Sequence, residues 1–463
     1  MEKSSAKILF YNENSDSIVA SAGRISTTQG SAVEIYEKSC EKDKSQNTNL
    51  IKKIISSGHT SVLEHVFFNL AFNNVSVFVE QFIIEFRLAS FTVKSRRYVD
   101  FGNMGYVSPE FDQYGENSRH MEEIYHRHME FLFKEYNSLL EQGIPKEDAR
   151  FVLPYSFRSN FYCTVNAREF IKIVNEMVWG RGKEYPEIVS LGESLIKQCE
   201  DKISFLDFGY GFEGRKKRDI KSMIETRHEA AKTCKEDGLA VLLNSTDNPE
   251  EVICRAALLA AGMDGFACEQ VKEPRIQKEI IQDILFSPRK RELEQAGFTI
   301  LFQRISLAGI THLVRHRMQS IVIPKYIDTC DFGKYIMPPS IVEAGLQETY
   351  ENVFRESEKV MDELRKEGLP RCDEVYLLLS GLTVPVMTTM NANELFTFIR
   401  LRTCNRAQWE IADNAKELLK ILREKHPILF SLYGPTCYVT GNCPEGQMSC
   451  GQMEQINNFF KNF

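Results

Sequence analysis

Apolar and polar positions follow the same order twice along this chain. Short alternating apolar runs at residues 66–71 and 298–302 predict β-strands, because alternation buries one face of a strand. A helix-like segment follows each run, ending near Arg87 in the first half and near Arg317 in the second. The two halves are therefore expected to contain the same elements in the same order.

A second helix is predicted to begin at Asn166 and again at Asn391. Each asparagine precedes a glutamate, Glu169 or Glu394, at the spacing of a reciprocal helix cap. Capping explains the asparagines without a ligand, and a ligand role is the alternative. The helix from Asn391 is expected to continue to residue 425. Its buried stripe would comprise Leu395, Phe398, Ile399, Ile411, Ala415, Leu418 and Leu422.

The sequence itself is duplicated. A segment beginning at Gly143 aligns without gaps with one beginning at Gly368, an offset of 225 positions. Upstream, a segment ending at Ser90 aligns with one ending at Ser320, an offset of 230 positions. Two similar offsets indicate one duplicated unit.

This duplication predicts three parts: a first repeat at 1–209, a polar linker at 210–237 and a second repeat at 238–463. Short strands mixed with long helices indicate an α+β unit, in which a sheet packs against helices. Two units of common ancestry are expected to pair about a pseudo-twofold axis, as in symmetric homodimers.

Composition narrows the classes of ligand. The 463 residues are 43% hydrophobic and carry a formal charge of -7, which gives no general attraction to nucleic acid or anionic membranes. A phosphate-bearing ligand would need a local cationic cluster. The N-terminus lacks a signal-like apolar core and no window reaches 18 apolar residues, so we expect a cytoplasmic protein with reduced cysteines.

The triplet Arg315-His316-Arg317 is the first candidate for such a cluster. It stands at the predicted end of a helix, where cations interact favourably with the helix dipole. A basic helix terminus that binds carbonyl groups is the structural alternative.

Several further segments together resemble the flavin-dependent thymidylate synthases. The resemblance involves GHTSVLEH at 58–65, RLASFTVKSRRY at 87–98, ARFVLP at 149–154, FYCTVNAR at 161–168, RHR at 315–317 and LRTCNRAQWEI at 401–411. It implies two units of that family's α+β fold, FAD as cofactor, and methylation of dUMP to dTMP with methylenetetrahydrofolate and NADPH as co-substrates.

Each repeat retains a different half of the family pattern. The first repeat keeps Ser95, Arg97 and Arg150 but has Glu85-Phe86 in place of Arg-His, and Met177 where the catalytic arginine is expected. The second repeat keeps the triplet at 315–317 and the catalytic arginine Arg402. It has lost the other half, with Lys325, Ile327 and Val375 at the positions that correspond to Ser95, Arg97 and Arg150.

Family active sites form between subunits of a homotetramer, so the resemblance implies one composite site per pair of repeats and a homodimer of this chain. The implied substrate-binding residues are Ser95, Arg97, Arg150, His312, Arg315 and the catalytic Arg402. The implied cofactor-binding residues are His59, Ser61, Glu64, Asn166, Arg168, Arg315, His316, Arg317 and Asn391. Turn hydroxyls for the serines, and surface ion pairs for Arg97, Arg150 and Arg402, are the structural alternatives.

One departure keeps other functions open. The family's loop carboxylate is absent from both repeats, which have Val93 and Ile323 instead. A flavin- or nucleotide-binding pseudoenzyme, or a flavoenzyme acting on another pyrimidine nucleotide, is the alternative function.

Cysteines gather near the C-terminus. Cys437, Cys443 and Cys450 lie in a glycine-rich tail, and Cys404 follows Arg402 closely. Clustered thiols in a reducing compartment are typical of a structural zinc site, although the spacing differs from common zinc knuckles. Free or redox-active cysteines are the alternative.

Overall fold

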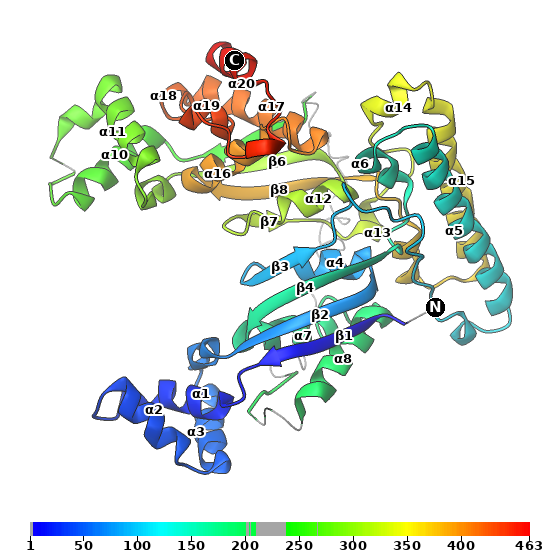
Figure 1. Ribbon diagram of the computed structural model, residues 1–463, viewed down its shortest axis with the longest axis horizontal. Coiled ribbons are helices and arrows are strands. Elements are labelled where there is room, and N and C mark those ends of the chain that lie inside the picture. The colour runs from blue at the N-terminus through cyan, green and yellow to red at the C-terminus, as the bar shows by residue number, and fades with distance from the viewer. Residues whose placement is uncertain (1–2, 201–202, 204, 210–237, 266) are drawn as a thin grey trace, which may run out of the picture. The chain divides into compact units, whose positions relative to one another are not determined.

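The computed structural model describes residues 3–200, 203, 205–209, 238–265 and 267–463 (Figure 1). The linker predicted at 210–237 lies outside these residues. The chain forms two compact units. Unit 1 comprises Met1–Ala230 with Met337–Ser380, and unit 2 comprises Ala231–Ile336 with Gly381–Phe463.

Unit 1 is built on an antiparallel sheet in the order β1-β2-β4-β3. Its strands are β1 (Ser5–Tyr11), β2 (Phe67–Ser76), β3 (Ala89–Val93) and β4 (Arg158–Asn166). Its α-helices are α1 (Ser15–Arg24), α2 (Ala32–Cys40), α3 (Lys44–Ser56), α4 (Val77–Ile84), α5 (Ser118–Glu141), α6 (Lys146–Ala149), α7 (Ala167–Val178), α8 (Pro186–Glu200), α14 (Pro339–Glu343) and α15 (Gln347–Glu367). Its 3₁₀ helices are η1 (Thr60–His65), η2 (Phe111–Gln113), η3 (Arg150–Val152) and η6 (Asp373–Leu377). Helix α8 packs against β1, and α7 packs against β2 and β4.

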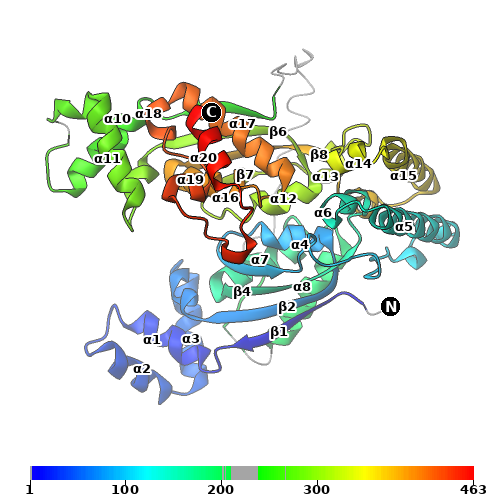
Figure 2. The ribbon, with the colours of Figure 1, turned by 45° about the horizontal axis from the view of Figure 1, so that its top comes forward.

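Unit 2 contains a second antiparallel sheet, in the order β5-β6-β8-β7. Its strands are β5 (Ala240–Ser245), β6 (Gly297–Ser306), β7 (Ser320–Val322) and β8 (Thr383–Asn391). Its α-helices are α10 (Pro249–Ala260), α11 (Pro274–Phe286), α12 (Leu307–Leu313), α13 (Tyr326–Thr329), α16 (Ala392–Arg402), α17 (Trp409–Lys425), α18 (Pro427–Phe430), α19 (Thr436–Thr440) and α20 (Met453–Asn462). Its 3₁₀ helices are η4 (Glu269–Lys272), η5 (Arg291–Gln295) and η7 (Gly446–Met448). Helix α17 packs against β5 and β6, and α16 against β8 (Figure 2).

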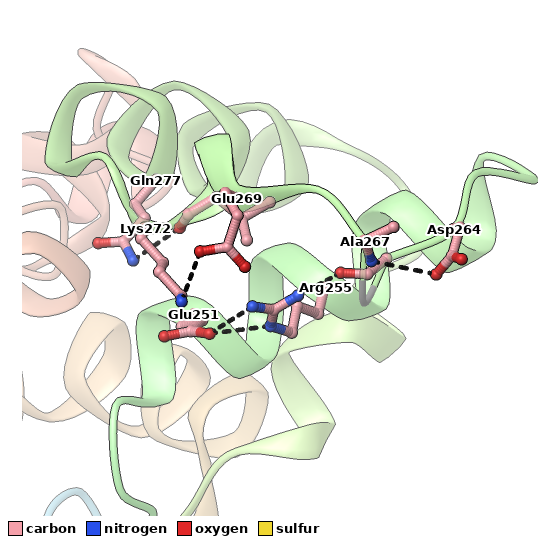
Figure 3. A network of polar contacts seen from close by, with 9 residues as sticks. Glu251, Arg255, Asp264, Ala267, Glu269, Lys272 and Gln277 are labelled. Carbon is pink, nitrogen blue, oxygen red and sulfur yellow. Dashed lines mark hydrogen bonds and ion pairs between the residues drawn. The ribbon is translucent and has the colours of Figure 1, made fainter.

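A polar network holds the connection between α10 and α11 (Figure 3). Arg255 pairs with Glu251 at 2.7 Å and donates to the Gly265 carbonyl. Lys272 pairs with Glu269 at 2.6 Å, and Gln277 donates to a backbone carbonyl of the same connection. These local contacts fix the loop without involving any predicted site residue.

Burial alternates along β6, where the sequence pattern predicts a strand, since Phe298, Ile300 and Phe302 are buried. The same alternation is seen on β4, which the sequence analysis did not predict. On β4, Phe161, Cys163 and Val165 are buried whereas Tyr162 is 56% exposed. Successive side chains of a strand point to opposite faces, so the helices cover one face of the sheet and Tyr162 lies on the other.

The strand registers confirm the duplication. Phe68 lies opposite Val165 in unit 1, and its counterpart Phe298 lies opposite Met390 in unit 2. The register shifts at the same place in both sheets, between residues 72 and 75 and between residues 302 and 305. The offsets of 230 and 225 positions therefore relate structurally equivalent residues.

One segment of the second sequence repeat, residues 337–380, belongs to unit 1. Helices α14 and α15 belong to the second repeat by sequence but pack within unit 1, where α15 contacts its counterpart α5. Next to them, Pro154 forms a β-bridge with Leu379, the residue 225 positions later. The amide of Tyr155 donates to the Leu378 carbonyl at 2.7 Å, and Ser380 donates to Leu153 at 2.9 Å. Two segments that are equivalent by the duplication thus pair with each other through reciprocal hydrogen bonds.

Two expected helices differ from the structure. The continuous helix predicted from Asn391 to residue 425 was wrong: α16 ends at Arg402 and α17 begins at Trp409. The Gln408 side chain caps the new helix by accepting from the Ile411 amide at 3.0 Å. The earlier segment also ends sooner than predicted, because α12 stops at Leu313 and leaves residues 315–317 in the following turn.

No helix among the described residues is long and apolar enough to cross a membrane.

Candidate functional site

Unit 1 gathers the predicted nucleotide-binding residues after β3. The Lys94 amide donates to the Asn160 carbonyl of β4, which anchors the loop that carries Ser95 and Arg97. Arg97 Nε lies 2.6 Å from a carboxylate oxygen of Glu147, and Arg150 Nε donates to the Glu147 carbonyl at 2.9 Å. Glu147 therefore links the two arginines that the sequence analysis placed together.

A buried ion pair fixes this loop. Arg96 is 7% exposed and pairs with the fully buried Glu80, which also accepts from the Ser159 hydroxyl. The Arg96 guanidinium lies 5.4 Å from the centre of the Phe157 ring. Our sequence analysis missed this pair. A carboxylate within the apolar run VFVEQFII was the available signal, because a buried charge requires a partner.

The electrostatics of this group combine two cations with two carboxylates. Arg97 and Arg150 act on Glu147 from one side of the charge balance, and the neighbouring Asp148 carboxylate acts from the other. Burial raises the pKa of Glu147, while the adjacent Arg97 and Arg150 oppose that rise. Arg150 is only 3% exposed, and its guanidinium lies 5.8 Å from the centre of the Phe151 ring. Arg97 and Arg150, which we call the paired-arginine group, are of the side-chain type that binds phosphate through forked hydrogen bonds.

A second predicted group occupies the other end of β4. His59 and Ser61 are exposed at η1, and Glu64 of the same helix pairs with Arg168 at 2.5 Å. Asn166 accepts from the Glu169 amide at 2.9 Å and therefore caps α7, as expected. Arg150 precedes β4 whereas Asn166 ends it. Within unit 1 the structure thus separates the predicted cofactor residues from the paired-arginine group.

Unit 2 brings together two side chains of helix α16 and one from the turn after α12. Glu394 and Arg402 lie two helical turns apart on one face of α16, and His316 lies between them. Glu394 Oε1 lies 3.2 Å from His316 Nδ1, and Arg402 Nε donates to His316 Nε2 at 2.9 Å. We call these residues the Glu394–His316–Arg402 cluster. Sequence analysis selected His316 and Arg402 separately and assigned Glu394 only a capping role.

The helix cap itself is confirmed in part. Asn391 accepts from the Glu394 amide at 2.8 Å, so it caps α16 as predicted. The Glu394 side chain, expected to return to the cap, bonds His316 instead. The Arg402 Nη2 group donates to the His312 carbonyl at 3.0 Å, which places His312 beside the cluster through its backbone.

Arg315 and Arg317 differ from His316 in exposure. Both arginines are exposed in the turn after α12, whereas His316 is 4% exposed. The turn therefore presents two cations to the surface and holds the imidazole inside. Exposed guanidinium groups of this kind suit the phosphates of a dinucleotide such as FAD. The positive charges of Arg315 and Arg317 thus match the negative charges of the FAD phosphates.

The repeats differ at equivalent positions. In unit 1, buried Phe86 and Met177 stand where unit 2 has His316 and Arg402. In the second repeat, the apolar Ile327 and Val375 are 8% and 1% exposed and stand in place of Arg97 and Arg150. Val375 itself packs within unit 1, because it belongs to residues 337–380. Each repeat therefore has buried apolar side chains at positions where the other repeat has polar ones.

The C-terminal cysteines are neighbours without forming a fitted metal site. Arg406 donates to the Met448 carbonyl at 2.7 Å, which holds the tail against the α16–α17 connection. Burial raises the pKa of Cys404, and Cys450 and Cys443 add to that rise. Among the described residues, the cysteines form no disulfide, and this includes Cys437. Throughout the described residues, no group of three or more possible ligand side chains could hold an ion. The predicted zinc site is thus not supported.

Two homologous α+β units, one with a paired-arginine group and the other with a histidine–arginine cluster, define a duplicated protein suited to phosphate-bearing ligands. Comparison with known families makes this class specific. The sequence matches the thymidylate synthase complementing protein family, Thy1, at residues 7–203 and again at 241–428. The chain belongs to this family, and the two matches agree with the duplication.

Single relatives match one half of the chain. The flavin-dependent thymidylate synthase of Clostridium tetani is 32% identical over 47% of this chain and 95% of its own length. That of Geobacter sulfurreducens is 31% identical over 48% of this chain and 97% of its own length. Among solved structures, a UMP/dUMP methylase, PolB from Streptomyces cacaoi bound with 5-Br dUMP, matches 44% of this chain and 92% of its own at 24% identity and a TM-score of 0.37.

Proposed function

We propose that this protein is a flavin-dependent thymidylate synthase that methylates dUMP to dTMP. Methylenetetrahydrofolate would provide the one-carbon group and NADPH the reducing equivalents. One composite site would combine the paired-arginine group of unit 1 with the Glu394–His316–Arg402 cluster of unit 2.

The complementary loss of polar groups is the observation that carries this proposal. Unit 1 retains Arg97 and Arg150 and has a fully buried Met177 in place of the catalytic arginine. The second repeat retains Arg402 and has buried Ile327 in place of Arg97. Independent decay of one copy would remove parts of both groups from the same repeat. A division between the repeats preserves one full set.

The retained side chains suit the two ends of the nucleotide. Arg97, Arg150 and the Ser95 hydroxyl would bind the 5′-phosphate through charge-assisted hydrogen bonds. Arg402 would donate to the carbonyl edge of the pyrimidine and stabilise the negative charge that develops as C5 becomes nucleophilic. This arrangement needs no cysteine nucleophile.

The cofactor residues are assigned from both units. Exposed Arg315 and Arg317 would bind the phosphates of FAD, and His59, Ser61 and Arg168 would contribute polar contacts from unit 1. Glu64 would orient Arg168 through their ion pair. Asn166 and Asn391 would act mainly through their helix caps, since both side chains accept from backbone amides. Bound in reduced form, the flavin would supply the electrons that convert the transferred methylene to a methyl group.

The functional assembly would be a homodimer. Family members use four subunits, so two double-length chains provide four units. The reciprocal pairing of the segments around Pro154 and Leu379 supports pseudo-symmetric pairing of the repeats.

Nucleotide stoichiometry tests the composite site. Calorimetric titration of the flavin-loaded protein with dUMP should give one site per chain, and tritium should be released from 5-labelled dUMP when folate and reductant are present. Two nucleotides per chain would refute the division between repeats. Binding of dUMP without tritium release would favour a pseudoenzyme, and turnover of a different pyrimidine nucleotide would redefine the substrate.

A further inference from the structure

His316 has both ring nitrogens occupied by protein side chains. Nδ1 faces Glu394 at 3.2 Å and Nε2 accepts from Arg402 Nε at 2.9 Å. The ring also packs edge-on against Phe398, with centroids 5.0 Å apart. With 4% exposure, the imidazole lies inside the unit rather than at its surface.

These contacts define the protonation of His316. The guanidinium of arginine only donates hydrogen bonds, so Nε2 must accept and cannot carry a proton. The single ring proton is then on Nδ1, where it is donated to the Glu394 carboxylate. Burial lowers the pKa of His316, Glu394 opposes this shift, and the charge on Arg402 adds to it. A neutral imidazole with one defined tautomer results.

Two hydrogen-bond acceptors therefore hold the Arg402 guanidinium group. The imidazole holds Nε, and the His312 carbonyl holds Nη2 at 3.0 Å. Two fixed hydrogen bonds define the plane of the guanidinium group. Glu394 in turn prevents the imidazole from flipping, because a flipped ring would place Cδ2 against Glu394 and Cε1 against Arg402 and lose both hydrogen bonds.

Unit 1 lacks the counterparts of His316 and Arg402 but keeps the counterpart of Glu394. Phe86 and Met177 replace the histidine and the arginine together, whereas Glu169 persists at the position of Glu394. That glutamate instead pairs with Lys172 at 3.2 Å. The imidazole and the arginine have thus been exchanged as a pair for apolar side chains, as expected if the histidine serves the arginine.

We propose that His316 is a positioning residue for Arg402, oriented by Glu394, rather than a direct ligand of the flavin. The inference deepens the proposed function, because Arg402 is its catalytic residue. In this arrangement, the Glu394 carboxylate fixes the tautomer, the imidazole fixes Arg402 Nε, and Arg402 presents the rest of its guanidinium to the pyrimidine.

Kinetics of His316 variants provide the first test. His316→Phe keeps the ring shape and removes the acceptor, so kcat for tritium release should fall about 100-fold, the cost typical of a displaced reacting group. KM for dUMP should change by less than about threefold. His316→Gln can still accept from Arg402, and should recover at least about tenfold of the lost kcat.

His426→Phe is the matched control. This second buried histidine of unit 2 hydrogen-bonds Ser245 at 3.1 Å and packs edge-on against Phe298 at 5.7 Å. Its substitution should lower thermal stability about as much as His316→Phe while leaving kcat within about twofold. Equal losses of kcat in the two variants, or loss of bound flavin in His316→Phe with unchanged kcat of the reloaded protein, would overturn the positioning role.

Nitrogen NMR tests the same inference without turnover. In protein labelled with ¹⁵N-histidine, His316 should show a protonated Nδ1 and an unprotonated Nε2 at pH 7.5, and the Nε2 signal should shift in Arg402→Ala. An imidazolium, or a proton on Nε2, would overturn the inference. Inactivity of the wild-type protein toward dUMP would instead refute the proposed function, and the NMR result would still decide the tautomer.

Discussion

Replacing Arg97 by alanine should weaken dUMP binding to the flavin-loaded protein. Arg97 lies beside Arg150 and is held by the Glu147 carboxylate at 2.6 Å, with the arginine side chain 28% exposed. A charge-assisted hydrogen bond of this partly buried kind contributes roughly 1.5–3 kcal/mol. The dissociation constant should therefore rise by about 10- to 150-fold.

The structure predicts a second contribution that weakens binding in the same direction. Without Arg97, the Glu147 carboxylate would face the phosphate of the nucleotide directly. Two charges about 7 Å apart at an effective dielectric constant of about 40 repel by roughly 1 kcal/mol. Arg97→Ala combined with Glu147→Gln should thus bind dUMP about fivefold more tightly than Arg97→Ala alone.

Calorimetry at one fixed salt concentration measures these constants. Arg181→Ala is the control, because Arg181 pairs with the similarly buried Glu85 at 2.9 Å and is not assigned to the nucleotide. A dissociation constant for Arg97→Ala within threefold of the wild-type value would contradict the phosphate assignment. Equal weakening by Arg181→Ala would show that loss of any such ion pair accounts for the effect.

Four other predictions follow from the same structure. Arg402→Ala should abolish tritium release while the flavin absorbance of the purified protein persists; loss of the flavin would place Arg402 at the cofactor instead. Met177→Arg should leave the dUMP stoichiometry at one per chain, and a second site in calorimetry would contradict the division between repeats. Light scattering should give a dimer of about 107 kDa, twice 53.3 kDa, and a stable monomer would refute the four-unit assembly. Burial lowers the pKa of His128 to about 4, although Glu356 opposes the shift. The unfolded chain therefore binds the proton more readily, and the free energy of unfolding should fall by roughly 3 kcal/mol as the pH drops from about 6.5 to 4. Denaturation profiles of His128→Leu should lack this part of the decline.

Much of the fold was readable from the sequence, because strand alternation and helix caps are local properties. The predicted strands overlap β2 and β6, and Asn166 and Asn391 cap their helices as expected. The helix break after Arg402 was not readable in the same way. Apolar spacing continues across it, and only the capping of α17 by Gln408 reveals two helices.

The sequence alone determined the duplication and which half of the family pattern each repeat keeps, since both follow from residue identity at fixed offsets. Tertiary structure decided how those residues work. Packing placed α14 and α15 in unit 1, because helix α15 packs against α5 of the first repeat. It also turned Glu394 from a cap toward His316. Such contacts join residues 78 positions apart, and their hydrogen-bond geometry depends on how strands and helices pack, which no local pattern of side chains encodes.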